Sequence, residues 1–411
     1  MSKFHISYWQ GPPAEYALQE ERIKEIADAG MTIANVWADF NDVKKMAPLF
    51  EKYGMTMNVF DHRMWGIWNQ DEGWQDKLRR LAKDYKDIPN LNCFFLKDEP
   101  IPEQFQKLRD MKDIISEVDS EHKCLVNLLP VPAREYSVEV YSKYIDDFIE
   151  VFEPDMLSYD HYNLMFKEVE EYGEEKEAIV SNENRKTNGW LDKKFIKYNR
   201  GQFMDNLEII RDRAHRHNIP WKIIILVTEH WDFRYLTEAE LRWGAFSSLC
   251  YGPAEIDWFT YWTPGGRAEG WDHHNAMIEL NGEKNTHYYM VQRINKELAL
   301  MGAEIVDAKS TEVLHIGNEP EDVLLRYFTG SYGPLKALNA SALVVGFFDN
   351  DCIMFSNKDM ENAQTINFAC DRDVYLFNKY NGGYTLMQQN EAGLYELKMS
   401  AGDGELIKIG K

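Results

Sequence analysis

The sequence predicts an α/β fold, namely a (β/α)8 TIM barrel followed by a small antiparallel β-sandwich domain. Its 411 residues exceed one ordinary domain and suit a barrel of about 250 residues with a smaller domain attached. Strand-like and helix-like segments alternate eight times over roughly the first 300 residues, a pattern that few architectures other than this barrel accommodate. Short strands separated by turns then take over. We therefore expect a barrel over residues 1–307 and a β-sandwich over residues 308–411.

The expected barrel strands share an apolar run that ends in polar or aromatic residues. A weak internal repeat supports this unit, because AGMTIANVWADF, from Ala29, resembles YGMTMNVFDHRM, from Tyr53, and each contains a glycine that ends a helix. Helical periodicity separates successive strands. The strands are expected over residues 4–9, 32–38, 56–60, 91–96, 124–129, 155–159, 223–227 and 256–262.

Two parts of the chain lie outside the barrel pattern. The segment from about Met165 to Arg200 is strongly charged, and long loops of this kind are usually functional lids or disordered. After Asp307, the runs VLLRYF, ALVVGFF, CIMFSN, TINFAC, VYLFN and LYELKM predict the strands of the sandwich, and no catalytic constellation is visible among them.

The composition disfavours several classes of function. A formal net charge of −22 disfavours binding to nucleic acid or to an anionic membrane surface, since both need basic patches. No apolar run reaches about 18 residues, so no membrane-spanning helix is expected. Five cysteines without C-x-x-C spacing indicate buried thiols, not a disulfide framework. The N-terminus enters a strand without a signal peptide, which favours a cytoplasmic protein; an exported protein whose signal has been removed is the alternative.

The stretch NLNCFFLKDEP, residues 90–100, organises the predicted barrel. Its apolar run fits a fully buried parallel strand, which ends abruptly in Lys97, Asp98, Glu99 and Pro100. Charged residues at the C-terminal end of a barrel strand mark the place where such barrels carry their chemistry. Alternatively, Asp98 and Glu99 simply begin the next helix, whose positive N-terminus favours acidic residues. We take Glu99 as the leading candidate for a catalytic residue.

Other strand ends are expected to bring carboxylates and aromatic rings to the same mouth. Sugar rings have apolar faces that stack on indoles and polar edges that hydrogen-bond to carboxylates, so the expected partner is a carbohydrate substrate. For each tryptophan, packing in the core is the alternative. The residues expected to contact substrate are Trp9, Trp37, His62, Asp98, Asp160, Tyr162, Trp231 and Trp262, with Trp65 and Trp271 as further aromatic candidates.

Two carboxyl groups suffice to cleave a glycosidic bond. One protonates the leaving oxygen, and the other attacks the anomeric carbon or activates water. Burial and neighbouring charges set the two pKa values separately, so an acid and a base can coexist. With Glu99 as the acid, Glu229 in the segment TEHWDF is the first candidate for the second carboxylate, and Asp160 is its rival.

These residues resemble those of clan A glycoside hydrolases, in particular the β-galactosidase-like bacterial (β/α)8 barrels with a C-terminal β-sandwich. The resemblance implies that Glu99 is the acid/base and Glu229 the nucleophile, with Tyr162 and Trp262 at matching places. The segment LRWGAFSSLCYGPAEIDWFTYW, from Leu241, is similar to the passage from helix 7 to strand 8 in such barrels. The implied activity is a glycoside hydrolase that needs no cofactor and no metal.

One departure from the clan pattern is Asp98, because the clan usually has an asparagine there, beside the substrate 2-hydroxyl. Strands 4 and 7 lie on opposite sides of an eight-stranded barrel, so Glu99 and Glu229 are expected to reach the axis from both sides. That placement predicts a separation of about 5–5.5 Å and retention of configuration.

Two other functions fit the same residues. A divalent-metal-dependent sugar isomerase or epimerase would draw its ligands from several strand ends. Since neighbours on a strand point to opposite sides, at most one residue of each adjacent pair is expected to face the mouth. A non-catalytic carbohydrate-binding barrel is the second alternative. His273 and His274 are expected to be exposed or to touch substrate. The candidate metal ligands are Asp61, His62, Glu99, Asp160, His161, Glu229 and His230.

Overall fold

The computed structural model describes residues 3–174, 176–265, 272–317 and 322–410. Its centre is a sheet of eight parallel strands in the order β1-β10-β9-β6-β5-β4-β3-β2. The sheet closes into a barrel between β1 and β2, where the Thr32 amide donates to the Ile6 carbonyl at 2.7 Å. These strands are β1 (His5–Trp9), β2 (Ile33–Ala38), β3 (Thr56–Asp61), β4 (Leu91–Asp98), β5 (Lys123–Leu128), β6 (Leu157–Asp160), β9 (Trp221–Leu226) and β10 (Glu255–Phe259).

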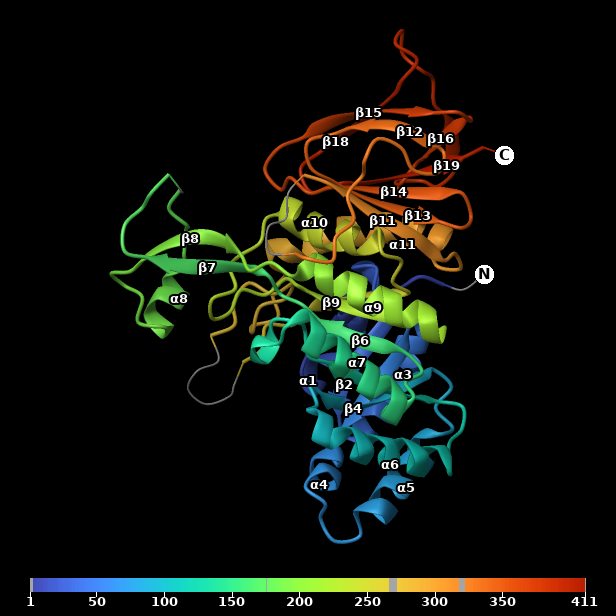
Figure 1. Ribbon diagram of the computed structural model, residues 1–411. Helices are drawn as coiled ribbons and strands as arrows, with labels where there is room; N and C mark the ends of the chain where they lie inside the picture. The colour runs from blue at the N-terminus through green and yellow to red at the C-terminus, as the bar shows by residue number, and fades with distance from the viewer. Residues whose placement is uncertain (1–2, 175, 266–271, 318–321, 411) are drawn as a thin grey trace.

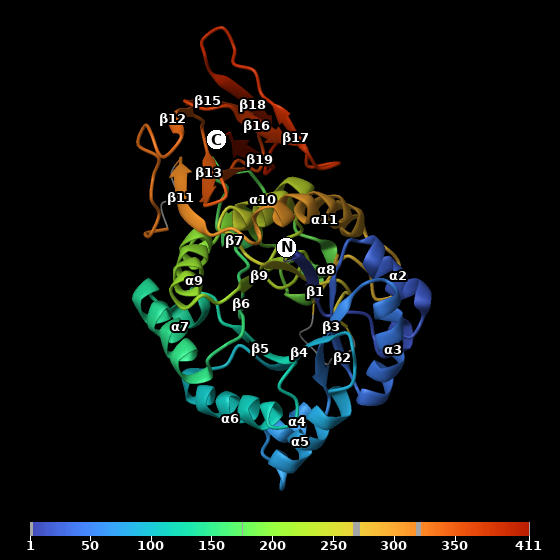
Figure 2. The same cartoon turned by 90° about the vertical axis from the view of Figure 1, so that its right-hand side faces the viewer.

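A ring of helices surrounds the barrel strands (Figure 2). Each long helix on the outside buries an apolar stripe; on α5 (Trp74–Tyr85) the stripe includes Leu78, Leu81 and Tyr85. The predicted alternation of strands and helices is therefore confirmed. The other helices of the ring are α2 (Glu20–Asp28), α3 (Phe40–Lys52), α6 (Phe105–Ser116), α7 (Val138–Phe152), α9 (Phe203–His217), α10 (Glu238–Leu249) and α11 (Thr286–Ile305), and the short helices α1 (Ala14–Ala17) and α4 (Met64–Trp68) follow β1 and β3.

The barrel interior holds a buried ionic group near the N-terminal ends of β9 and β10. Lys222 Nζ lies 2.9 Å from Glu255 and 3.0 Å from Asp257. Asn35 of β2 donates to Asp257 at 3.0 Å, and Ser7 of β1 donates to Glu255 at 2.5 Å. A buried charge needs such partners, since removing one of them leaves the other uncompensated. The group ties four strands together beneath the mouth.

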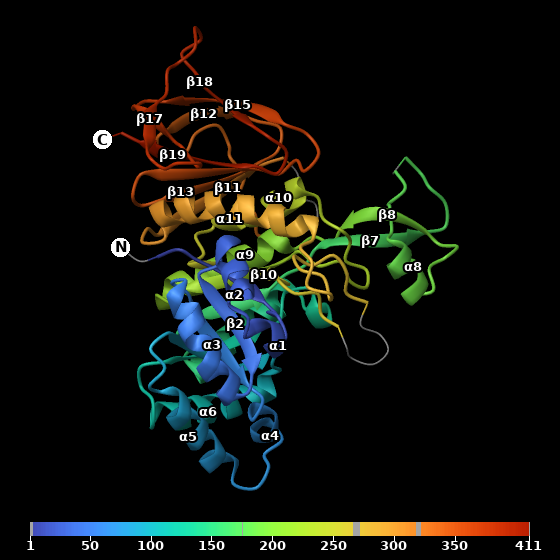
Figure 3. The same cartoon turned by 180° about the vertical axis from the view of Figure 1, so that it is seen from behind.

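The segment expected as a long loop contains regular structure instead. Strands β7 (Leu164–Val169) and β8 (Lys194–Asn199) form an antiparallel ribbon, and helix α8 (Asn182–Thr187) lies between them in the chain. This arm projects to one side of the barrel (Figures 1 and 3). It has a small apolar core of Phe166, Ala178, Val180 and Phe195 with Trp190 packed against it, which explains why charged sequence still folds there.

The C-terminal part consists of antiparallel sheets, as the sequence predicts. A six-stranded sheet and a three-stranded sheet face each other across a shared apolar core. The expected strand VLLRYF is not a regular strand, because only Tyr327 forms a bridge, with His315. The six-stranded sheet contains β11 (Ser310–Ile316), β13 (Leu343–Phe348), β14 (Cys352–Asn357), β16 (Val374–Phe377), β17 (Tyr384–Leu386) and β19 (Gly404–Ile409), and the three-stranded sheet contains β12 (Leu335–Asn339), β15 (Gln364–Cys370) and β18 (Tyr395–Met399).

Helix α10 lies between the barrel and the C-terminal sheets (Figure 1). It is buried on nearly all sides and rich in small residues, which let the sheet approach closely. At Gly346 of β13, an added Cβ would lie 2.1 Å from the Cys250 carbonyl oxygen at the end of the helix. Arg242 of α10 also bonds Asp403 at 2.8 Å, so apolar packing and charge both join the two parts. Within the described ranges, no helix is long and apolar enough to cross a bilayer.

Gly346→Ala should lower the free energy of unfolding by about 1–3 kcal/mol, the usual cost of overpacking. The matched control is Gly244→Ala in α10, where the added Cβ would meet only Ile225, at 3.8 Å. That control should be neutral or stabilising by up to about 1 kcal/mol, because alanine is the better helix former. Urea unfolding followed by circular dichroism measures both. Equal stabilities for the two variants would show that β13 and α10 do not approach this closely in solution.

Candidate active site

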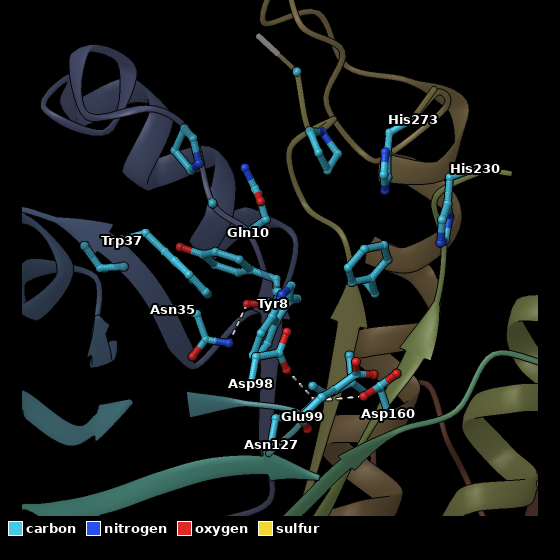
Figure 4. Close-up of a pocket in the computed structure, with 18 of the residues that line it drawn as sticks. Tyr8, Gln10, Asn35, Trp37, Asp98, Glu99, Asn127, Asp160, His230 and His273 are labelled. Carbon is cyan, nitrogen blue, oxygen red and sulfur yellow. Dashed lines mark hydrogen bonds between the residues drawn. The ribbon is translucent and has the colours of Figure 1, made fainter. Parts of the chain in front are cut away.

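A cavity of about 690 Å³ lies at the C-terminal ends of the barrel strands. Its walls come from β1, β2, β4, β5, β6, β9 and β10 and from the segments that follow them (Figure 4). Its size suits a small-molecule ligand. The expected substrate-contacting residues that line it are Trp9, Trp37, His62, Asp98, Asp160, Tyr162 and Trp231, together with Glu99 and Trp65.

Asp98 and Glu99 both open to this cavity, although they are neighbours in the chain. Regular strand alternation predicts that only one of them faces the mouth. The register of β4 against β5 shifts between Phe95 and Lys97, and Glu99 takes a left-handed conformation with φ of 47°. This irregular end turns the second side chain inward, a re-aiming that bulges commonly produce next to active sites. The expectation of one inward residue per adjacent pair is therefore wrong here.

Asp160 from the end of β6 joins the two carboxyl groups of β4 (Figure 4). Asn127 of β5 lies between them, and its side-chain amide donates to Asp160 at 2.8 Å and to Asp98 at 3.1 Å. The Ser158 hydroxyl donates to the Asn127 amide oxygen at 3.0 Å. The backbone amide of Glu99 donates to the Asn127 carbonyl at 2.8 Å, which holds the end of β4 against β5.

All three carboxyl groups have raised pKa values. Desolvation inside the cavity raises the pKa of Asp98 to about 6, although the residue is exposed at the cavity mouth. Burial, and then the charge of Asp98, raises the pKa of Glu99 to about 7, against the opposing effect of Arg134. For Asp160, burial is the first cause and the charges of Glu99 and Asp98 follow, so its pKa lies well above the usual range. The cluster therefore keeps protons near neutral pH, which acid catalysis requires.

Aromatic side chains form much of the remaining wall. Trp9 and Trp37 meet edge to face with ring centroids 5.8 Å apart, and both pack against Phe95. The ring of Tyr162 lies 5.0 Å from that of Phe259. This mixture of aromatic faces and carboxylates is the arrangement expected for a sugar ring with apolar faces and polar edges.

Two stacked histidines line the cavity opposite the tryptophans. The rings of His230 and His273 lie 4.6 Å apart and nearly parallel, at 8°. His230 Nδ1 lies 2.8 Å from the Thr228 carbonyl oxygen, which only a donor can approach, so this nitrogen carries the proton. Burial, and then His273, lowers the pKa of His230 to about 3. His230 is therefore neutral, with Nε2 as a hydrogen-bond acceptor.

Glu229 does not line this cavity, in contrast to its expected place beside Glu99 at the barrel mouth. It is 1% exposed and follows β9, but its carboxylate accepts hydrogen bonds from Asn184 of α8 at 3.0 Å and from Asn275 at 2.7 Å. It borders a separate cavity between the barrel and the arm. Alternation explains the result, because His230, the next residue, faces the active-site cavity instead.

Two other residues that were expected at the barrel mouth, Trp262 and Asp61, do not line the cavity. Trp262 is 3% exposed, does not line the cavity and packs on Tyr16 with ring centroids 4.8 Å apart, so the core alternative holds for it. Asp61 accepts hydrogen bonds from Arg63 and Tyr85 and does not line the cavity. Trp271 lies outside the described residues. His273 is 4% exposed and lines the cavity, so it is not the exposed residue of one alternative, and its contact with substrate stays a prediction.

Sequence reasoning missed several residues of the cavity. Asn127 sits near the end of the predicted fifth strand, where a polar residue in an apolar run was the available signal. Tyr8, Gln10 and Asn35 line the wall beside Trp9, and Arg200 enters from the end of the arm. Among the residues that the structure describes, no group of three His, Cys, Asp or Glu side chains is placed to hold a metal ion.

A scan against protein-family models and a search of the curated proteins found no match. Solved structures share the fold. A β-galactosidase from Bacillus circulans sp. alkalophilus matches at a TM-score of 0.59 and 10% identity, covering 99% of each chain. A family 42 β-galactosidase from G. stearothermophilus matches at 0.59 and 8% identity, covering 99% of this chain and 98% of that one. A family 39 glycoside hydrolase from Bacteroides cellulosilyticus WH2 matches at 0.56 and 10% identity, covering 100% and 81%. The barrel and C-terminal sheets expected from the clan A resemblance are thus confirmed as a fold.

Asp160→Asn should stabilise the protein at about pH 8, and the gain should shrink as the pH falls to about 4. A carboxyl group whose folded pKa is raised costs stability once the unfolded chain ionises, so the cost grows as pH rises above the unfolded pKa of about 3.9. Thermal unfolding across this pH range measures the effect. A gain that does not change with pH would contradict the raised pKa of Asp160.

Asp61→Asn is the matched control, because Asp61 also ends a barrel strand. Burial acts to raise the pKa of Asp61, but the hydrogen bonds and charge of Arg63, with Tyr85, lower it overall. Such a group contributes stability above the unfolded pKa and loses it as pH falls through the folded pKa. The variant should therefore destabilise the protein at about pH 8, and the loss should shrink in acid.

Proposed function

We propose that the protein is a glycoside hydrolase that cleaves O-glycosidic bonds in this cavity. The observation that carries the proposal is the convergence of Asp98, Glu99 and Asp160 on one cavity with aromatic walls. Carboxyl groups supply the acid and the second carboxylate that glycoside cleavage needs. The names of the three structural neighbours, two β-galactosidases and a family 39 glycoside hydrolase, support the same class of reaction.

In this proposal Glu99 is the general acid. Its side chain opens to the cavity, and its pKa of about 7 keeps it largely protonated in mild acid. As the bond between the anomeric carbon and the leaving oxygen breaks, Glu99 gives its proton to that oxygen and becomes a carboxylate. It then takes a proton from the incoming water, which restores the acid.

Asp160 is the proposed second carboxylate and takes the role first expected of Glu229. It comes from β6, two strands around the barrel from β4, so it approaches a bound sugar from a different direction than Glu99. While Glu99 holds the proton, its charge no longer raises the pKa of Asp160, which favours ionised Asp160. Asp98 remains the proposed contact for a substrate hydroxyl.

Glu99→Gln should lower kcat by roughly 10²–10⁴-fold on an aryl glycoside with a poor leaving group, since it keeps the shape and removes the proton. Asp160→Asn should cause a loss of the same order. Glu229→Gln is the matched control and should leave kcat within about threefold, because Glu229 borders another cavity. A panel of nitrophenyl glycosides identifies the substrate first. A large loss in Glu229→Gln with little change in Asp160→Asn would return the role to Glu229.

We also propose that the reaction retains the anomeric configuration, as the clan A resemblance implies. Retention requires that Asp160 attack the anomeric carbon and form a covalent glycosyl intermediate, which water then opens. Proton NMR of the first-formed sugar shows which anomer appears before mutarotation. Appearance of the inverted anomer first would mean that the second carboxylate activates water instead.

A further inference from the structure

Asn127 occupies an unusual position, because its one side-chain amide serves two carboxyl groups. One amide nitrogen lies 2.8 Å from Asp160 and 3.1 Å from Asp98, so its two N–H bonds point at different strands. The Ser158 hydroxyl donates to the amide oxygen at 3.0 Å, which fixes the orientation of the amide. Asn127 is only 2% exposed and Asp160 8%, so the bond between these two residues is shielded from water, whereas Asp98 is exposed to the cavity.

The third carboxyl group of the cluster lacks this support. Among the described residues, no side chain donates a hydrogen bond to the carboxyl group of Glu99; only its backbone amide is bonded, to the Asn127 carbonyl. A hydrogen bond donated to a carboxylate favours its ionised form. The hydrogen bonds of Asn127 therefore act to lower the pKa values of Asp98 and Asp160, against the burial that raises them, and no such bond acts on Glu99.

We propose that Asn127 is a positioning residue that directs the shared proton of the cluster to Glu99. By donating to Asp98 and Asp160, it opposes the burial that raises their pKa values, and the more these two groups ionise, the more their negative charge keeps the proton on Glu99. The residue so determines which group is the acid and which is the second carboxylate. The catalytic consequence rests on the proposed function, whereas the distribution of the proton can be measured without substrate.

Other charged and titratable groups surround the cluster and act on it from several elements. Lys97 and Arg134 lower the pKa of Glu99, and Lys97 also acts on Asp98. Arg200 lines the cavity from the arm. The phenols of Tyr141, Tyr144, Tyr159 and Tyr162 lie close enough to interact with the cluster and are neutral, because burial raises each of their pKa values. None of these groups donates to both aspartates, as Asn127 does.

Asn127→Ala tests the proposal, with Asn58→Ala as the matched control. Asn58 of β3 is equally buried, at 2% exposed, and among the described residues its side chain bonds two asparagines, Asn35 at 2.8 Å and Asn92 at 2.7 Å. The readout is the carbon-13 NMR titration of side-chain carboxyl groups in labelled protein without ligand. In Asn127→Ala the midpoints of Asp98 and Asp160 should move to higher pH and that of Glu99 to lower pH. In Asn58→Ala all three should stay in place.

Kinetics add a second signature that a merely structural role would not produce. The pH profile of kcat/KM in Asn127→Ala should narrow from both sides. The midpoint of its acid limb should move to higher pH because the aspartates protonate more easily. The midpoint of its alkaline limb should move to lower pH because Glu99 loses its proton more easily. A uniform loss of rate with an unchanged profile would overturn the proposal.

The two measurements separate this inference from the proposed function. If no glycoside is hydrolysed but the carboxyl midpoints move as expected, the proposed function fails and Asn127 still directs the proton. If the midpoints of Asp98 and Asp160 stay unchanged in Asn127→Ala, the inference fails whatever the activity. If Asn127→Ala does not fold, Ser158→Ala is the second variant, because it removes the hydrogen bond that fixes the Asn127 amide and keeps Asn127 itself. The titration midpoints should then move in the same directions by a smaller amount. Unchanged midpoints in Ser158→Ala would overturn the inference.

Discussion

The partial enclosure of Asp98, Glu99 and Asp160 in one cavity, with the repulsion that Asp98 adds at Glu99 and that both add at Asp160, is the constraint on which the rest of the mouth depends. Three acids that share one partly enclosed space cannot all ionise at little cost, so the cluster keeps protons that separate carboxyl groups would lose. Asn127 supplies donors to two of them, and the cations Arg134 and Lys97 favour the ionised form of the third. The same burial and repulsion that cost stability provide a group that can donate a proton near neutral pH.

The closed barrel holds the three carboxyl groups at fixed positions relative to one another. The carboxyl groups come from the ends of β4 and β6, two strands on either side of β5, whose relative positions are set by the hydrogen bonds of a sheet without free edges. Beneath them, Lys222 joins Glu255 and Asp257 in the barrel interior, while helix α10 is clamped between the barrel and the C-terminal sheets. A site on such rigid elements can hold groups that repel each other at fixed separations.

Two neighbouring side chains that follow β9 lie in different environments, because they point to opposite sides of the chain. His230 faces the carboxylate cavity, and Glu229 faces the arm, where Asn184 and Asn275 bond it. Glu229 thereby links the barrel to α8 and to the loop that carries His273 and Asn275. Its buried carboxylate has a clear structural use in joining these segments.

The sequence by itself determined the barrel, because apolar strands and amphipathic helices alternate with a period that local physics dictates. It also placed Glu99, since charges that end a buried strand stand out against their neighbours. The inward turn of both Asp98 and Glu99 was decided by a register shift and a left-handed residue, which depend on how β4 meets β5. The hydrogen bonds from Asn127 to Asp98 and Asp160, and the presence of Asp160 at the cavity where Glu229 was expected, were likewise decided in three dimensions. Which side of a strand end faces the mouth depends on the sheet register and on segments distant in the chain, and a linear pattern contains neither.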